Sequence, residues 1–151
     1  MILIYNLISI SVVQFNLYAI YQGLAYYDYN IYYSMNLSLF LERVIKHLTQ
    51  NIDIFKRPIC AIGCGLFNEG GNISHLSGFP SGHMTLTSNF FNNLLITHGR
   101  NNDRKYIIIY NIPCLLMAIA RYGKCCHDIP QIIGGYMLGY FIALLTNDNY
   151  Q

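Results

Sequence analysis

Long stretches without a charged side chain are the feature that most restricts how this chain can fold. Residues 1–27 carry no charge, and Asp28 is the first acidic or basic residue. Residues 106–120 and 132–147 are also uncharged. Apolar stretches of about 20 residues are typical of transmembrane helices. Only 11% of the residues are charged, against about 25% in soluble domains, so much of the surface is expected to face lipid.

The hydrophobic pattern predicts an all-α fold, a multi-pass transmembrane helical bundle of about five spans. These are expected at about residues 2–26, 30–47, 81–97, 106–121 and 129–147. The length of 151 residues suits a single membrane-embedded domain over 1–151. The third helix carries Asn89, Asn92 and Asn93, which favours a position inside the bundle over one facing lipid.

Composition and charge disfavour several other classes of protein. A soluble domain with a tyrosine-rich core is the main alternative to a membrane protein, and the charge deficit argues against it. The net charge is +2 and the basic residues are scattered, so no nucleic-acid partner is expected. The first apolar segment lacks a preceding basic region and a cleavage site, and we expect a retained helix rather than a signal peptide.

Five cysteines leave several interpretations open. Cys60 and Cys64 lie in a polar loop and would pair with each other if that loop faces an oxidising compartment. A zinc site that includes His75 is conceivable, although the spacing is poor. Free thiols that behave as small hydrophobic side chains are the expectation we favour.

Polar residues with useful chemistry gather in two connections, a long loop at about 48–80 and a short one at 122–128. Counting spans places both connections on the same side of the membrane. The helix ends and loops there carry Arg57, Ser81, Gly82, His83, Arg121 and His127. Topology alone therefore predicts that two guanidinium groups and two imidazoles meet at one end of the bundle.

The tetrapeptide Pro80-Ser81-Gly82-His83 opens the third helix. Unpaired N–H groups at a helix start bind anions, and glycine lets the backbone approach a ligand closely. The serine hydroxyl would add a donor, and His83 in the first turn would point into the site. A plain serine cap of the helix is the alternative interpretation.

Arg121, His127 and Gln131 form a second group. Gln131 follows His127 by four residues, so both lie on one face if the last helix begins near His127. The glutamine would then hold one ring nitrogen and leave the other free to attack. Arg57 adds a planar fork for phosphate oxygens. Each residue also has a simpler interpretation. Arg121 could extend its side chain from the helix end to the membrane surface, His127 could lie at the interface, and Arg57 could be a solvated charge.

These blocks together resemble the type 2 phosphatidic acid phosphatase superfamily, which also contains the vanadium haloperoxidases. The family pattern is Lys, six residues, Arg-Pro; then Pro-Ser-Gly-His; then Ser-Arg, five residues, His, three residues, Asp. The matching residues are Arg57-Pro58, Pro80-Ser81-Gly82-His83, Arg121, His127 and Gln131. The resemblance implies an acid phosphatase/vanadium haloperoxidase-like core over about residues 40–147.

The chain departs from the family pattern in several places. Gln50 stands where the lysine is expected, and Lys46 lies about one helical turn further back. We favour Lys46 as the phosphate lysine, with Lys56 as the fallback. Ala120 replaces the family serine, and Gln131 replaces the aspartate, a variant that resembles dolichyl diphosphatases and glucose-6-phosphatase. About five spans are expected here, against the family's usual six.

The resemblance implies a mechanism without a metal or cofactor. His127 would attack phosphorus and form a phosphohistidine, oriented by Gln131, while His83 would act as general acid and then as general base. The groups that would bind the phosphate oxygens are Lys46, Arg57, Ser81, Gly82 and Arg121. Their cations would take over the role that metal ions play in other phosphoryl transfers.

The expected function is hydrolysis of a lipid phosphate or diphosphate, of the dolichyl diphosphate or phosphatidate class. An inactive relative that binds lipid phosphates or acts as a membrane scaffold is the alternative. The basic connection from Arg100 to Lys105 favours the cytosolic side for that loop. The site would then be lumenal, as in an endoplasmic-reticulum membrane, or extracellular, and the sequon Asn72-Ile73-Ser74 lies on the same side.

Overall fold

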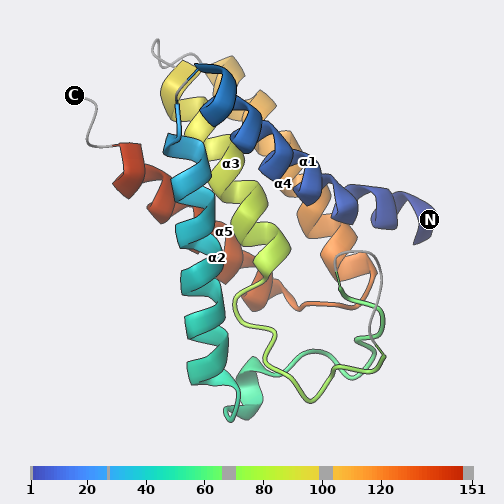
Figure 1. Ribbon diagram of the computed structural model, residues 1–151. Helices are drawn as coiled ribbons and strands as arrows, with labels where there is room; N and C mark the ends of the chain where they lie inside the picture. The colour runs from blue at the N-terminus through green and yellow to red at the C-terminus, as the bar shows by residue number, and fades with distance from the viewer. Residues whose placement is uncertain (1, 27, 66–70, 99–103, 148–151) are drawn as a thin grey trace.

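The computed structural model describes residues 2–26, 28–65, 71–98 and 104–147 (Figure 1). Its elements in chain order are α1 (Ile2–Tyr26), α2 (Asn30–Thr49), the 3₁₀ helix η1 (Asp53–Phe55), α3 (Gly82–His98), α4 (Arg104–Gly123) and α5 (Ile129–Asn147). The basic connection at 100–105, from which the membrane orientation is predicted, lies mostly outside the described residues. The all-α fold class is confirmed, and the helix bounds agree with those predicted to within a few residues.

Three of these helices are long and apolar enough to cross a membrane: α1 from Leu3, α4 and α5. The two remaining α-helices are more polar. α2 carries Glu42, Arg43 and Lys46, and α3 spans just 17 residues. The sequence predicts about five spans; within the described residues, three helices have the length and hydropathy of a span.

Apolar side chains cover the outer faces of α1 and α4. The exposed set includes Leu3, Leu7, Leu17 and Leu24 on α1, and Ile108, Ile109, Ile112 and Leu115 on α4. An apolar surface of this extent is unusual for a protein surrounded by water. It suits helices that face lipid.

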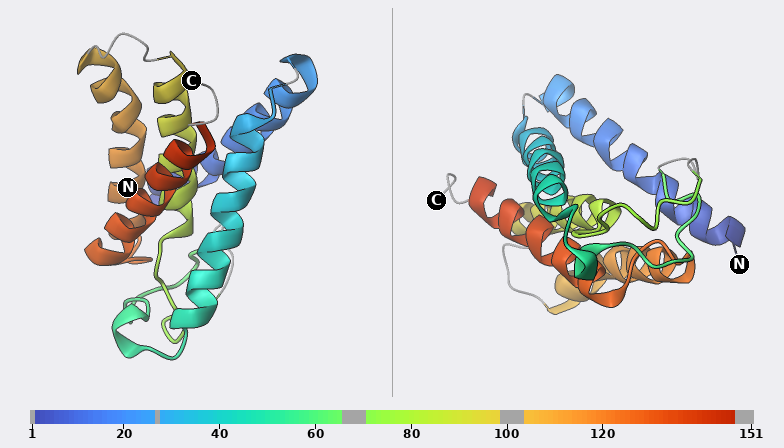
Figure 2. Two further views of the ribbon diagram at one scale, coloured as in Figure 1. Left: turned by 90° about the vertical axis from the view of Figure 1, so that its left-hand side faces the viewer. Right: turned by 90° about the horizontal axis from the view of Figure 1, so that it is seen from below.

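α3 lies in the middle of the bundle and packs most extensively against α5 (Figure 2). The two helices approach closely because glycines of α5 face the backbone of α3. A Cβ on Gly135 would lie 2.6 Å from the carbonyl oxygen of Ser81, and Gly139 faces the backbone of Thr85 and Asn89. Small residues four apart allow such close helix packing in membranes.

The predicted burial of the polar α3 residues Asn89, Asn92 and Asn93 is confirmed. The side-chain amides of Asn89 and Asn93 donate to the Ser34 hydroxyl of α2, at 2.7 and 3.1 Å. The Asn89 amide also reaches the Gly139 carbonyl of α5, at 3.3 Å. These hydrogen bonds join three helices inside the bundle, where unpaired polar groups would be costly.

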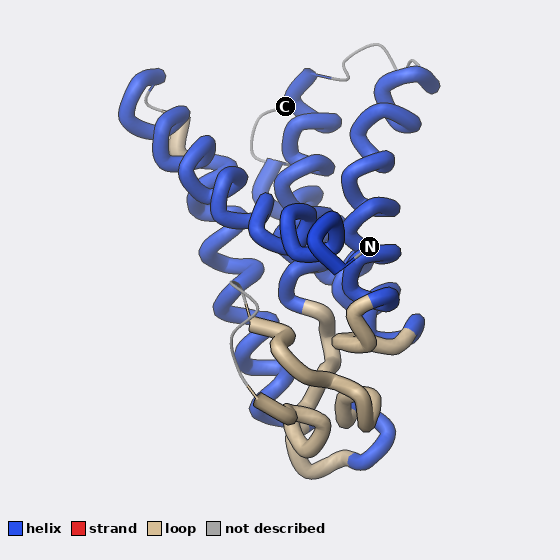
Figure 3. Tube along the Cα trace, turned by 90° about the vertical axis from the view of Figure 1, so that its right-hand side faces the viewer, coloured by secondary structure: helices blue, strands red, loops and turns tan. Residues whose placement is uncertain are grey.

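The loops gather at one end of the bundle (Figure 3). There α2 and α4 end, α3 and α5 begin, and the segment between α2 and α3 folds beneath them (Figure 1). This segment is ordered by two isolated β-bridges, Lys56 with Ser77 and Ile62 with Asn72. Both functional connections therefore lie at the same end of the bundle, as span counting predicts.

Candidate active site

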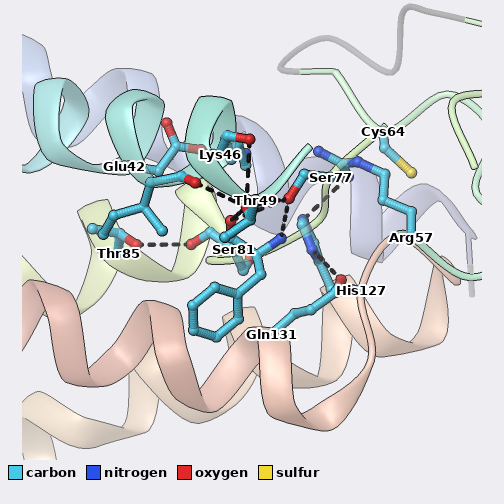
Figure 4. Close-up of polar contacts among 12 residues, drawn as sticks. Glu42, Lys46, Thr49, Arg57, Cys64, Ser77, Ser81, Thr85, His127 and Gln131 are labelled. Carbon is cyan, nitrogen blue, oxygen red and sulfur yellow. Dashed lines mark hydrogen bonds and ion pairs between the residues drawn. The ribbon is translucent and has the colours of Figure 1, made fainter. Parts of the chain in front are cut away.

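His127 lies in the connection before α5 and is almost fully buried, with 2% of its surface exposed. The Asp128 carboxylate accepts the backbone N–H of Gln131 at 2.9 Å, which anchors the first turn of α5. That turn places the Gln131 side chain beside the imidazole, with 3.0 Å between Gln131 Oε1 and His127 Nδ1 (Figure 4). The two residues share a face, as their spacing predicts.

The amide of Gln131 has a defined orientation. Its Nε2 donates to the backbone carbonyls of Lys56, at 2.8 Å, and Phe55, at 3.4 Å. Oε1 therefore faces His127 and can only accept, so Nδ1 of His127 carries the proton. The other ring nitrogen, Nε2, keeps its lone pair and lies 3.3 Å from Nη1 of Arg57.

Arg57 reaches this imidazole from the long loop. Its backbone N–H donates to the Leu76 carbonyl at 3.1 Å, and its Nη1 donates to the Cys126 carbonyl at 3.2 Å. Burial lowers the pKa of the Arg57 guanidinium, while the nearby Glu42 carboxylate opposes that shift. Arginine remains protonated in either case. A solvated loop cation, the alternative interpretation of Arg57, does not fit these contacts.

Arg121, at the end of α4, points into the bundle and is fully buried. Its Nη2 donates to the Cys64 carbonyl at 2.8 Å, and its Nη1 donates to the Ser9 hydroxyl of α1 at 3.3 Å. The snorkelling alternative for Arg121 is therefore wrong. A buried guanidinium with no carboxylate in these contacts leaves an uncompensated positive charge, which suits the binding of an anion.

The turn that opens α3 is tied to α5 through its backbone. The N–H of Ser81 donates to the carbonyl of Gln131 at 3.0 Å. Ser81 is fully buried, and its hydroxyl has no hydrogen-bond partner among the described residues. The plain helix-cap interpretation predicts such a partner for the hydroxyl. The Ser81 side chain is instead left for a ligand.

The structure separates the two lysines that the sequence offers. Lys46 forms an ion pair with Glu42 one turn earlier in α2 and lines the cavity described below. Lys56 pairs with Asp53 at 2.6 Å, and its side chain is 42% exposed. Lys46, the favoured candidate, is therefore the lysine positioned beside the other site residues.

Glu42 is a residue that the sequence analysis does not single out. It is buried, and its carboxylate covers Gly82, where a Cβ would lie 2.7 Å from Oε1. Gly82 thus makes room for Glu42. An acidic residue one turn before Lys46, in a helix meant for the membrane, is the signal that would have identified it.

A cavity of about 210 Å³ connects these groups. Its polar and charged lining comprises Glu42, Arg43, Lys46, Arg57, His83, Arg121 and His127, together with Gly82 and Cys64. Three lining residues carry a buried polar atom without a hydrogen-bond partner within the described part of the chain, at Arg57 Nε, His83 Nε2 and Arg121 Nε, and so does Ser81 Oγ, next to Gly82 in the chain. Buried polar atoms are normally paired, so this cluster suits a ligand rich in acceptor oxygens.

The electrostatics of the cavity keep His127 neutral. Burial lowers the pKa of His127 well below its usual value, and the charges of Arg57, Arg121 and Lys46 lower it further. The hydrogen bond to Gln131 acts in the opposite direction. A neutral imidazole whose unprotonated Nε2 faces Arg57, in a cavity that holds two further cations, is suited to attack an electrophilic centre that carries negative oxygens.

The cysteine expectations are corrected by the structure. Cys60 pairs with Cys125 and Cys64 pairs with Cys126, so neither the Cys60–Cys64 pair nor free thiols at these positions form. The sequence could not reveal this because the partners are more than 60 residues apart. Cys114 is free and buried. The zinc alternative with His75 finds no support: the described residues contain no group of three metal-ligating side chains.

The family model of the PAP2 superfamily matches residues 29–151. The chain therefore belongs to this superfamily, as its sequence motifs predict. Membership supports the hydrolysis of lipid phosphates as the general class of reaction. No match was found among curated proteins or among solved structures.

Proposed function

We propose that this protein hydrolyses a phosphate or diphosphate ester of a lipid through a phosphohistidine on His127. The observation that carries the proposal is the cavity lined by His127, Arg57 and Arg121, in which each guanidinium keeps an Nε without a partner among the described residues. Donors preorganised around a transferring phosphoryl group stabilise the charge that develops there, and this is usually the largest contribution to catalysis.

In the first step Nε2 of His127 attacks phosphorus in line with the leaving oxygen. The P–O bond to the lipid or to its inner phosphate breaks, and His83 donates a proton to the departing oxygen. Phosphate oxygens are held by Lys46, Arg57, Ser81, the N–H of Gly82 and Arg121. The Nδ1 proton of His127 stays hydrogen-bonded to Gln131 throughout.

In the second step the neutral His83 accepts a proton from water, and the oxygen of that water attacks phosphorus. The P–N bond to His127 breaks, inorganic phosphate leaves, and His127 returns to its neutral form. His83 is protonated again for the next cycle. No metal ion or cofactor takes part in this scheme.

A polyisoprenyl diphosphate such as dolichyl diphosphate is the substrate we favour. Gln131 in place of the family aspartate and the segment from Lys46 to Cys60 resemble dolichyl diphosphatases, and a cavity at the end of the bundle suits a headgroup at a membrane surface. We place the protein in a membrane as an integral, multi-pass protein with the site on the lumenal side, as in the endoplasmic reticulum.

The test is turnover of purified, detergent-solubilised protein on a lipid diphosphate in the presence of a chelator. We expect phosphate release by the wild type, and none above background by His127→Ala or His83→Ala. Full activity of either variant would refute the assigned roles. Sensitivity to vanadate, which mimics pentacoordinate phosphorus, is expected as well.

A lipid-phosphate binder without turnover is the second candidate. Two observations favour it: Gln131 cannot stabilise an imidazolium by charge, and Glu42 competes with phosphate for Lys46. Vanadate or phosphate binding by a wild-type protein that shows no turnover on any lipid phosphate would decide for this candidate.

A further inference from the structure

Two disulfides join the same two segments of the chain, the loop after Arg57 and the connection before α5. The outer disulfide is Cys60–Cys125 and the inner disulfide is Cys64–Cys126, with Cα–Cα distances of 5.7 and 5.5 Å. Both distances lie in the range that disulfides span. Cys60 is exposed, whereas Cys64 and Cys126 are buried.

The inner disulfide links the backbone groups that hold the two site arginines. The Cys64 carbonyl accepts from Arg121 at 2.8 Å, and the Cys126 carbonyl accepts from Arg57 at 3.2 Å. His127 directly follows Cys126. The Cys64–Cys126 bond therefore limits the distance between the two carbonyls that accept from Arg121 and Arg57.

Among the described residues, the inner disulfide has several further contacts: the Cys126 N–H donates to the Arg121 carbonyl at 3.0 Å, and the outer disulfide joins the adjacent Cys125 to Cys60. Cys64 and Cys126 form a small apolar cluster with Ala61, against which Ile73 packs. Two backbone hydrogen bonds order the neighbouring loop: from Ala61 to the Pro58 carbonyl at 3.0 Å, and from Ile73 to the Ala61 carbonyl at 3.1 Å. A loop held by cross-links and single hydrogen bonds opens at a lower cost in free energy when one cross-link is lost.

We propose that the inner disulfide positions Arg57 and Arg121, so that the anion site is assembled only while Cys64 and Cys126 are oxidised. This inference rests on the proposed function, because the site it controls is the phosphate site. Cys64 and Cys126 are positioning residues, acting through the two arginines. The outer disulfide lies nearer to solvent and cross-links the same two segments. Neither of its cysteines accepts a hydrogen bond from Arg57 or Arg121 in the contacts described above.

Reduction of the inner disulfide would abolish the anion site through a defined chemical step. A dithiol such as dithiothreitol supplies two electrons and two protons. The Cys64–Cys126 S–S bond breaks, two thiols form, and the reductant becomes a cyclic disulfide. Since disulfides persist in oxidising compartments, the cavity would face the lumen or the outside of the cell. This agrees with the lumenal side proposed above.

The test compares three variants that differ in which cysteines they lack. Cys64→Ser/Cys126→Ser removes the inner disulfide, Cys60→Ser/Cys125→Ser removes the outer one, and Cys114→Ser removes the buried free thiol as a control. Disulfides are mapped by non-reducing peptide mass spectrometry on protein alkylated in its native membrane. The inhibition or binding constant of vanadate and the melting temperature are then measured for each.

We expect wild-type protein to contain both disulfides. Loss of the inner one should weaken vanadate binding at least tenfold, while loss of the outer one or of the Cys114 thiol changes it less than threefold. Because the inner variant can fail to fold, wild-type protein is also reduced with dithiothreitol, freed of the reductant before vanadate is added, and later reoxidised. Vanadate binding should fall on reduction and return on reoxidation, with helical circular dichroism retained.

Free Cys64 and Cys126 thiols in protein that binds vanadate would overturn the inference. So would unchanged vanadate affinity after complete reduction of the inner disulfide. Oxidised protein that binds vanadate in this redox-dependent way but hydrolyses no lipid phosphate would refute the proposed function and leave the positioning role intact. Oxidised wild-type protein that binds no vanadate would contradict both.

Discussion

Gln131 determines which nitrogen of His127 is free to react. Its Nε2 is fixed on the Lys56 carbonyl at 2.8 Å, so its Oε1 must face His127 Nδ1 at 3.0 Å. A neutral side chain thus replaces the aspartate of the family pattern while keeping the acceptor function. The hydrogen bond from Gln131 Nε2 to the Lys56 carbonyl also ties the loop that carries Arg57 to α5.

Replacing Gln131 with methionine should lower kcat about 10- to 100-fold, the range in which loss of an orienting partner affects metal-bound histidines. The shape is nearly preserved, but the imidazole loses the acceptor that selects its tautomer. Gln131→Glu keeps an acceptor for Nδ1 and should lose less. Steady-state kinetics on a lipid diphosphate measure both. A methionine variant as active as the wild type would show that Gln131 does not orient His127.

His127 should remain neutral at a pH of about 6, where an ordinary histidine is largely protonated. Burial and three nearby cations lower its pKa well below the usual 6.5, and the neutral form is the one able to attack. Activity limited by this group should therefore persist into mildly acidic solution and be lost only below the usual range. Nitrogen-15 NMR of labelled histidines reports the ionisation directly. Half-protonation of His127 at 6.5 or above in ligand-free protein would contradict the electrostatic picture.

Lys46→Met should weaken vanadate binding more than the double variant Glu42→Gln/Lys46→Met. The single substitution leaves the buried Glu42 carboxylate without its partner, beside the cavity and over Gly82. A buried charge deprived of its partner costs several kcal/mol, roughly 3–5, whereas removal of both charges costs less. We expect losses of about 100-fold and about 10-fold. Equal losses would show that Glu42 does not act on the anion site.

Gly139→Ala should destabilise the bundle by about 1–3 kcal/mol, as overpacking generally does. The new methyl group would meet the backbone of Thr85 and Asn89 and push α5 away from α3. Gly71→Ala is the matched control, since a Cβ there has nothing within 4 Å. Thermal unfolding in detergent measures both. A Gly139 variant as stable as the control would show that the helices separate without cost.

Much of this architecture can be read from the sequence. Uncharged stretches locate α1, α4 and α5, and span counting places the loop of Arg57 at the same end of the bundle as His127. The spacing of His127 and Gln131 on one helix face predicts their contact, because a local helical repeat decides it. Helix positions, the end of the bundle at which a loop lies and contacts within one helix depend on chain direction and helical periodicity, and both can be obtained from the sequence.

What escaped prediction depends on contacts between distant segments. The pairing of Cys64 with Cys126 follows from how the two connections fold onto each other, and cysteine positions alone allow several pairings. The burial of Glu42 over Gly82 depends on the crossing of α2 and α3. The partner of Asn89, the Ser34 hydroxyl of α2, likewise depends on how the helices pack, although the polarity of α3 predicts that Asn89 is buried.

Trapping of the phosphoenzyme tests the central claim most directly. Wild-type protein is mixed with a lipid diphosphate labelled with ³²P at the terminal phosphate, quenched within milliseconds and digested. We expect an alkali-stable, acid-labile label on the peptide that contains His127, and no label in His127→Ala. A turning-over enzyme that never acquires this label, or a label that persists in His127→Ala, would contradict the phosphohistidine mechanism.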